Sequence, residues 1–308
     1  MNTVEELEHV TCSLCGSKDY INTYISKDYL FSQETFTVVR CKACGLLFTN
    51  PRVKETQIGG YYYPGYLTFN NSKQVGVFQK IKNKVGRLFG SIHWEVLQTL
   101  ESTNVKTVLE IGPGNGSLLY FLKEHGFEVV GIETDSHCAQ KIQEQGIACH
   151  CGDLNDVISN IGAKKFDAVI LCHAFEHVYH PKKTLKNIYD LLNENGVVYL
   201  SLPNSGSREA KLFGKHWKGL DLPRHIVHYD TNTIRLILQG AGFDVIKIEN
   251  QGFPSSFVES IGFRFFKKRK MPNKVYAFVY YPWKILSPIH LRLFGSGIMK
   301  VLSFKKNV

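Results

Sequence analysis

Residues 108–116 read Val108-Leu109-Glu110-Ile111-Gly112-Pro113-Gly114-Asn115-Gly116, an apolar run that leads directly into a glycine-rich turn. Glycines let the backbone turn sharply and let a ligand approach it closely. A helical pattern follows at residues 117–124, so the turn is predicted to join a buried strand to a helix. The spacing is Gly-x-Gly-x-Gly, with Ser117 where a pyrophosphate-binding fingerprint has glycine or alanine, and no P-loop ending follows. A phosphate-bearing cofactor is therefore disfavoured.

Apolar runs and helical patterns alternate on both sides of this turn. Strand patterns occur at residues 107–111, 128–132, 168–172, 196–202 and 244–249, and helical patterns at 117–124, 137–145, 181–192 and 231–241. Such alternation is typical of parallel strands joined by crossover helices. The predicted fold class is α/β, with a Rossmann-like, doubly wound and mostly parallel sheet at residues 105–250. The last fifty residues show no pattern that fits this sheet, and a helical C-terminal extension is expected there.

Two acidic side chains follow predicted strands of this sheet. Glu133 ends the second strand, 17 residues after Gly116, and a carboxylate there can accept both ribose hydroxyls of a nucleoside. Asp153 follows the third strand, where it could accept the amino group of an adenine. The ordered series of loop and acids indicates a nucleoside cofactor in the crevice of the sheet.

Residues 106–250 resemble class I S-adenosylmethionine (SAM)-dependent methyltransferases, most closely the ubiquinone-biosynthesis type of O-methyltransferase. The resemblance implies that the protein is an enzyme that uses SAM. It implies that the loop cradles the methionine part of SAM, that Glu133 binds the ribose, and that Asp153 with Leu154 contacts the adenine. His173, at the end of the fourth strand, is assigned to the same site. The cofactor residues expected in this way are Glu110, Gly112, Gly114, Gly116, Glu133, Asp153, Leu154 and His173.

Two Cys-x-x-Cys-Gly motifs near the N-terminus are separated by 25 residues. They supply Cys12 and Cys15 from the first motif, and Cys41 and Cys44 from the second. Such a pair offers four thiolates to one tetrahedral zinc ion, and the glycine eases the tight turn after each pair. The chain shows no secretion signal at its beginning, so disulfides are the weaker alternative. The motifs predict a zinc-ribbon-like module with a structural metal at residues 1–50.

Histidines are dense in two segments that follow the central strands. The first runs from His173 to Val178 and contains Glu176 and His177, and the second contains His225 and His228. The first segment resembles the ubiquinone-type enzymes, and the pair resembles small-RNA 2′-O-methyltransferases, in which two glutamates and two histidines hold a divalent ion. His173 stands where that family has its first glutamate. A divalent metal, a histidine general base, or a local pairing of Glu176 with packed histidines all remain open. The catalytic candidates are His173, Glu176, His177, His225 and His228.

The positive charge of the chain is concentrated in its last part. Residues 260–308 hold eleven Lys or Arg and no Asp or Glu, whereas the whole chain has a net charge of +10. Ten aromatic residues lie among these cations, a composition typical of a segment at a membrane interface. The same composition could bind RNA or form a packed tail. The expected localisation is cytoplasmic, with peripheral contact to the inner face of the membrane, because no apolar run is long enough to span a bilayer.

Four regions are therefore expected: 1–50, a tyrosine-rich helical cap at 51–104, the SAM-binding domain at 105–250, and a basic aromatic extension at 251–308. The stretch 217–225 resembles bacterial methyltransferases of surface-polysaccharide and lipid-glycan pathways. The expected function is O-methylation of a sugar or lipid-linked small acceptor. An RNA methyltransferase and a non-catalytic SAM-binding partner subunit are the alternatives, with nucleic acid the less favoured partner.

Overall fold

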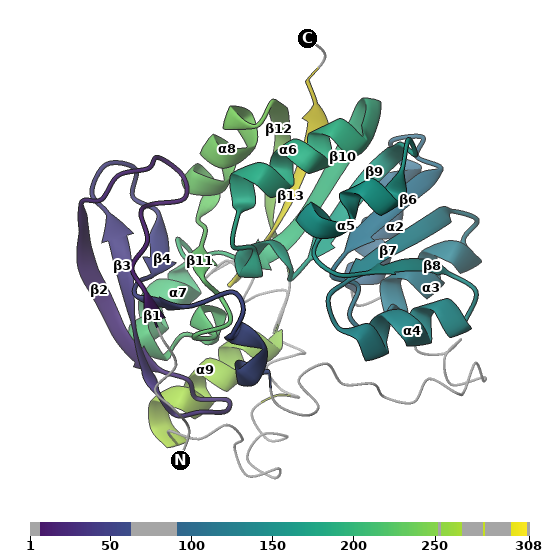
Figure 1. Ribbon diagram of the computed structural model, residues 1–308. Helices are drawn as coiled ribbons and strands as arrows, with labels where there is room; N and C mark the ends of the chain where they lie inside the picture. The colour runs from purple at the N-terminus through teal and green to yellow at the C-terminus, as the bar shows by residue number, and fades with distance from the viewer. Residues whose placement is uncertain (1–6, 63–90, 252–253, 267–279, 281–296, 307–308) are drawn as a thin grey trace.

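The computed structural model describes residues 7–62, 91–251, 254–266, 280 and 297–306, and at its centre is a sheet of seven strands (Figure 1). These strands are β6 Thr107–Ile111, β7 Glu128–Glu133, β8 Ala148–Cys151, β9 Phe166–Cys172, β10 Leu192–Pro203, β12 Phe243–Gln251 and β13 Ile298–Lys305. Their order across the sheet is β12-β13-β10-β9-β6-β7-β8. The strands from β10 to β8 are parallel, and β13 is antiparallel to both of its neighbours. The predicted α/β fold class is confirmed.

Helices cover both faces of this sheet. They are α2 Ile92–Glu101, α3 Ser117–Glu124, α4 Ser136–Glu144, α5 Leu154–Ile161, α6 Pro181–Leu191 and α8 Thr231–Gly240. The apolar sides of α2, α3 and α4 pack on one face, and those of α5, α6 and α8 pack on the other. Along β9, Ala168 and Ile170 pack on the side of α2 and α3, whereas Val169 and Leu171 pack on the side of α5, α6 and α8. A strand buried on both faces must be apolar throughout, which explains the uninterrupted runs in the sequence.

A small antiparallel sheet stands beside the central sheet (Figure 1). Its strands from the N-terminal region are β2 Tyr20–Lys27, β3 Thr35–Cys41 and β4 Leu47–Thr49, and a separate pair is formed by β1 Leu7–Glu8 and β5 Arg52–Val53. A fourth strand, β11 Val227–His228, pairs with β4. The order of the small sheet is β11-β4-β3-β2, and the two cysteine motifs lie at the turns before β2 and between β3 and β4. Phe48 and Val227 are both buried in the main core. The packing of the module therefore continues into the central domain beyond residue 50.

The segment between β10 and α8 consists of short elements that surround this contact. They are α7 Arg208–Phe213, η3 Gly214–His216, η4 Lys218–Leu220 and β11. The longer helix α9 Pro254–Phe266 packs against α7, η3 and η4. A further short helix, η1 Ile58–Tyr61, follows β5. Through η3, which contacts β2, these elements also touch the N-terminal sheet.

β13 corrects one expectation about the C-terminal region. Residues 298–305 lie inside the central sheet, between β10 and β12, and the expectation that the last fifty residues stay outside the sheet was wrong for them. Met299 and Val301 have no exposed surface. The physical reason is that the partner strands are distant in sequence, so no local pattern announces the pairing. The extension is thus helical at α9 and a strand at β13.

Other expectations fall outside the described residues. These are residues 63–90 of the tyrosine-rich helical cap expected at 51–104, and the greater part of the basic aromatic tail, at 267–279 and 281–296. None of the helices in the described ranges combines the length and the apolar character needed to span a bilayer.

Candidate active site

The glycine loop connects β6 to α3 with a sharply turned backbone. Gly112, Gly114 and Gly116 have φ values of 72°, 55° and 71°, in the left-handed region that glycine adopts at little cost. A Cβ on Gly112 would lie 2.9 Å from the Cβ of Ala174, and one on Gly116 would lie 2.8 Å from Ile142. The loop therefore needs glycine for its conformation and for its close packing.

Glu133 ends β7 and points its carboxylate at this loop. Its Oε2 accepts a hydrogen bond from the Gly114 backbone at 2.7 Å, and its Oε1 accepts from the Asp135 backbone at 3.0 Å and the Thr134 hydroxyl at 3.3 Å. A carboxylate offers about four lone-pair sites. Burial raises the pKa of Glu133 despite these hydrogen bonds. The side chain thus supports the loop and keeps some capacity to accept from a ligand hydroxyl.

Glu110 lies in β6, two residues before the first glycine of the loop, and is 3% exposed. Its Oε2 has no hydrogen-bond partner among the described residues. Burial first, and then the neighbouring Glu133, raise the pKa of Glu110 to about 8. A buried carboxyl in this state gains charge most readily when a cationic group arrives beside it. The methionine part of SAM carries both an ammonium and a sulfonium, so the position suits the role that the resemblance implies.

Asp153 and Leu154 follow β8 at the same edge of the sheet. The preceding Gly152 donates its backbone N–H to the Glu133 carbonyl at 2.9 Å, so the two strand ends are in contact. Asp153 caps α5 by accepting from the Asn155 backbone at 2.8 Å. The Leu154 side chain is 1% exposed and belongs to the core. Any contact from Leu154 to a ligand would therefore come from its backbone.

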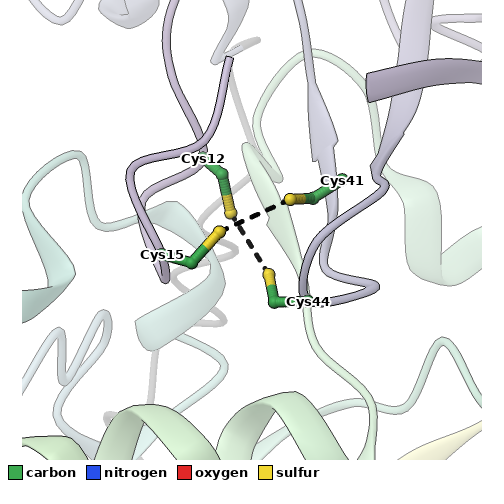
Figure 2. Close-up of side chains that lie close together, drawn as sticks. All are labelled: Cys12, Cys15, Cys41 and Cys44. Atoms are coloured by element: carbon green, nitrogen blue, oxygen red, sulfur yellow. Dashed lines mark hydrogen bonds between the residues drawn. The ribbon is translucent and has the colours of Figure 1, made fainter. Parts of the chain in front are cut away.

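The four cysteines converge on one point. Figure 2 shows Cys12 and Cys15 facing Cys41 and Cys44, with the Cys12–Cys44 and Cys15–Cys41 sulfurs each 3.5 Å apart. All four sulfurs lie within 4.8 Å of one another. A tetrahedral zinc site with bonds of about 2.3 Å places its sulfurs roughly 3.8 Å apart. Burial and the neighbouring thiols raise the pKa of Cys44 above its usual range, which a cation would reverse. The donor set and spacing are compatible with zinc.

A second cluster joins the two histidine-bearing segments. Glu176 and His177 lie in η2 Phe175–His177, just after β9, and His225 lies just before β11. One ligand atom from each of these three residues falls within 4.8 Å of the other two. Glu176 is 1% exposed, and neither carboxylate oxygen has a hydrogen-bond partner among the described residues. The structure thus brings residues of the two histidine-bearing segments together.

Both imidazoles of this cluster are anchored through Nδ1. His225 Nδ1 lies 2.9 Å from the Gly219 carbonyl, and His177 Nδ1 lies 2.9 Å from the Arg224 carbonyl. A carbonyl can only accept, so in each ring Nδ1 carries the proton and Nε2 keeps a lone pair. His225 Nε2 lies 3.8 Å from Glu176 Oε1. Histidines held by their second nitrogen are typical of metal ligands and of oriented bases.

The electrostatics favour a negative Glu176 carboxylate beside a neutral His225. Burial acts to raise the pKa of Glu176, but His173, His225 and His177 outweigh it and lower the pKa to about 2. Burial, together with the nearby His177, lowers the pKa of His225 to about 4. Near neutral pH the cluster therefore holds one carboxylate and an uncharged His225, the combination that binds a cation or accepts a proton.

The remaining candidates take different places. His173 directly follows β9, with its Nδ1 3.6 Å from Glu176 Oε1, and its φ of 55° is unusual for a residue other than glycine. His228 lies in β11, and burial lowers its pKa to about 3. Its Nε2 lies 3.3 Å from the Thr49 hydroxyl, and it is not one of the three residues whose ligand atoms come together.

The cofactor crevice and the histidine cluster are neighbours. Ala174, which meets Gly112 of the loop, stands between His173 and Glu176. The half-buried Cys172, one residue before His173, has its pKa raised by desolvation and then by both Glu110 and Glu176. A molecule held at Glu176 would therefore lie beside the part of the crevice where Glu110 is.

Sequence reasoning missed several residues that surround the cluster. The Tyr62 hydroxyl lies 3.2 Å from His177 Nδ1, although Tyr62 is 115 positions away. Arg224 is 1% exposed and donates to both oxygens of Asp28, to Asp221, and to the carbonyls of Tyr61 and Leu222. The Pro-Arg-His stretch was a signal in the sequence, but one of the acidic partners of Arg224, Asp28, comes from the N-terminal sheet.

Comparisons with known proteins agree with this architecture. Residues 84–248 match the model of a family described as a methyltransferase domain. A ubiquinone biosynthesis O-methyltransferase of Coxiella burnetii is 26% identical over 131 residues, which are 40% of this chain and 54% of that protein. An uncharacterized methyltransferase of Alkaliphilus oremlandii is 30% identical over 105 residues, or 33% and 48% of the two chains. The chain thus spans about half the length of these relatives.

Solved structures share the fold. A chain of the complex between the Haloferax volcanii Trm112 methyltransferase activator and a methyltransferase superposes with a TM-score of 0.50 at 17% identity, covering 73% of this chain and 94% of that one. The family model covers more than half of the chain, and its span includes the glycine loop, the strand-end acids and the cluster at Glu176. The chain therefore belongs to the methyltransferase-domain family, with the class I, SAM-dependent architecture.

Proposed function

We propose that the protein transfers the methyl group of SAM to a hydroxyl oxygen of a small acceptor bound at Glu176, His177 and His225. The observation that carries the proposal is that this buried cluster adjoins the glycine loop through Ala174. When bound, SAM supplies an electrophilic methyl carbon. The acceptor oxygen forms the new bond to that carbon as the sulfur–carbon bond breaks, and the hydroxyl proton must leave.

The chain's own residues supply orientation and a route for the proton. Glu133 and the loop glycines hold the nucleoside and the methionine part, as the resemblance to the family implies. His173 is one-third exposed beside Glu176 and can take the proton to solvent. Its left-handed backbone is an unusual conformation of the kind that clusters at functional sites.

Glu176, His177 and His225 also fit a divalent cation. The carboxylate oxygens of Glu176 are buried and have no hydrogen-bond partner in the described part of the chain, and both rings present Nε2 because Nδ1 is anchored. A cation bound by two imidazoles and a carboxylate would lower the pKa of an acceptor hydroxyl. Zinc is the ion proposed for the four cysteines, where its role is structural because no ligand position stays open.

A sugar or lipid-linked hydroxyl compound is the proposed acceptor class. Support comes from the oxygen-compatible donor set of the cluster and from the O-methyltransferase names of several relatives. The resemblance of residues 217–225 to methyltransferases of polysaccharide pathways points the same way. The basic aromatic tail, if it contacts anionic lipid, would suit a lipid-linked acceptor.

The test is methyl transfer from labelled SAM to a panel of sugars, phenols and lipid-linked glycans, with and without added divalent ions. Glu176→Gln and His225→Ala should lose transfer but keep SAM affinity. His180→Ala is the matched control, because His180 is exposed and pairs with the exposed Glu55. Transfer that survives both cluster variants would refute the assigned site, and transfer to RNA alone would replace the acceptor class.

A further inference from the structure

The N-terminal cysteine module and the acceptor cluster share one sheet. β4 begins three residues after Cys44, and it pairs with β11 in the register Phe48 to Val227 and Leu47 to His228. β11 begins two residues after His225. Only a few residues therefore separate a metal-binding sulfur from the strand pair that positions His225.

Thr49, the last residue of β4, ties this pairing to the histidines. Its backbone N–H donates to the Ile226 carbonyl at 3.0 Å, and its hydroxyl lies 3.1 Å from the His225 carbonyl and 3.3 Å from His228 Nε2. A hydroxyl has one proton, which it must donate to the carbonyl, so His228 Nε2–H donates to the hydroxyl. Thr49 has no exposed surface, so water cannot replace these bonds.

A buried ion pair makes a second connection. Asp28 lies in the turn between β2 and β3, where its carboxylate accepts the backbone N–H groups of Leu30, Phe31 and Ser32. It also accepts from Arg224 at 2.7 and 3.2 Å, and neither side chain is exposed. Arg224 directly precedes His225 in the chain. Removing Asp28 leaves the buried guanidinium of Arg224 with Asp221 as its remaining acidic partner among the described residues, so part of its compensation is lost.

We propose that the cysteine module is part of the scaffold of the acceptor site, with Thr49 and Asp28 as positioning residues for His225. Loss of the metal from the four cysteines then loosens the turn before β4 and displaces His225. The effect on methyl transfer rests on the proposed function, whereas the position of the imidazole can be measured by itself.

The experiment uses ¹⁵N-histidine spectra of the full chain, with His225→Gln and His228→Gln to assign the two rings. Cys15→Ser removes one cysteine ligand without a chelator, which would strip both clusters. Thr49→Val removes the hydroxyl at constant shape, Thr49→Ser restores it, and Asp28→Asn removes the charge. Asp19→Asn is the control, because the Asp19–Lys42 pair is exposed in the same module.

The expected result is a shift of the His225 and His228 signals in Cys15→Ser, Thr49→Val and Asp28→Asn, with recovery in Thr49→Ser. The remote His125 ring, bound to the Phe121 carbonyl, should not move. Methyl transfer should fall about fivefold or more in kcat for Thr49→Val, the effect of one lost buried hydrogen bond, while the Kd for SAM stays constant.

Unchanged His225 signals in folded Cys15→Ser and in Thr49→Val would overturn the proposal. If Cys15→Ser does not fold, the His225 signals of Thr49→Val and Asp28→Asn test the proposal, because both variants keep the four cysteines. A wild-type protein without any transfer would count against the proposed function only, since the spectra would still report the position of His225.

Discussion

Glu133 has two tasks, because the same carboxylate supports the glycine loop and is expected to bind the ribose. Replacing it with alanine removes the acceptor of the Gly114 N–H and of the ligand hydroxyls. A hydrogen bond to a charged group contributes about 1.5–3 kcal/mol, so SAM affinity should fall roughly 10- to 150-fold. Isothermal titration with SAM and its demethylated product measures this. Glu128→Gln, an exposed change at the start of the same strand, should leave the affinity alone, and equal affinity in both variants would remove Glu133 from the crevice.

The raised pKa of Glu110 predicts that the free energy of unfolding depends on pH. This pKa is raised to about 8 in the folded protein, first by burial and then by Glu133, whereas the unfolded chain ionises near its ordinary value of 4.5. The folded state therefore holds a proton that the unfolded state releases. The contribution of Glu110 to the free energy of unfolding is fully present below pH 4.5. It is lost as pH rises toward 8, by about 1.4 kcal/mol per pH unit.

The variant Glu110→Gln tests that dependence, because an amide cannot ionise. The melting temperatures of the variant and the wild type are measured without SAM at pH 6 and pH 8.5. The difference, variant minus wild type, should be larger at pH 8.5. A constant difference across this range would mean that Glu110 is already ionised in the folded protein.

At the scale of secondary structure, β13 is expected to be essential for folding. Met299 lies in the main core without exposed surface, so Met299→Ala should lower the free energy of unfolding by about 2–5 kcal/mol. Urea unfolding measures the change. Lys306→Ala, at the exposed end of the same segment, should cost less than about 0.5 kcal/mol. Similar values for both variants would show that β13 is not integrated into the sheet in solution.

The two cysteine motifs should bind one metal ion per chain. Elemental analysis of purified protein should give one zinc from the four-cysteine site, and Cys15→Ser should lower that content because three thiolates bind less tightly than four. Cys138→Ser, a buried cysteine away from the site, is the control. Metal-free protein that remains fully folded would rule out a structural ion.

Elements with local signals could be predicted, and those that depend on distant partners could not. β6 and α3 agree with their predicted bounds at 107–111 and 117–124, because an apolar run, a glycine turn and a helical face lie together in sequence. β13 escaped prediction since its partners, β10 and β12, lie about 50 to 100 positions away. In the site, Glu176 and His225 were found from their local density, whereas Thr49, Asp28 and Tyr62 reach the cluster only through tertiary folding.

For the whole molecule, the basic tail yields a prediction about membranes. If residues 267–270 contact anionic lipid, replacing Lys267, Lys268, Arg269 and Lys270 with glutamine should abolish sedimentation with anionic vesicles. Binding by the wild type should weaken with salt, because exposed charges are screened within about 10 Å at 0.1 M ionic strength. SAM affinity should not change. The test substitutes charged residues and does not delete the tail, because a deletion would also remove β13 from the central sheet.

The place of β13 also orders events during synthesis. It is the last strand of the central sheet to leave the ribosome, yet it fills the position between β10 and β12. Until residues 298–305 have emerged, a nascent chain presents the unpaired edges of these two strands, which can join the same edges on a neighbouring chain of the polysome. Yield from the ribosome, and its dependence on chaperones and on translation rate, is therefore decided by the final eight-residue strand.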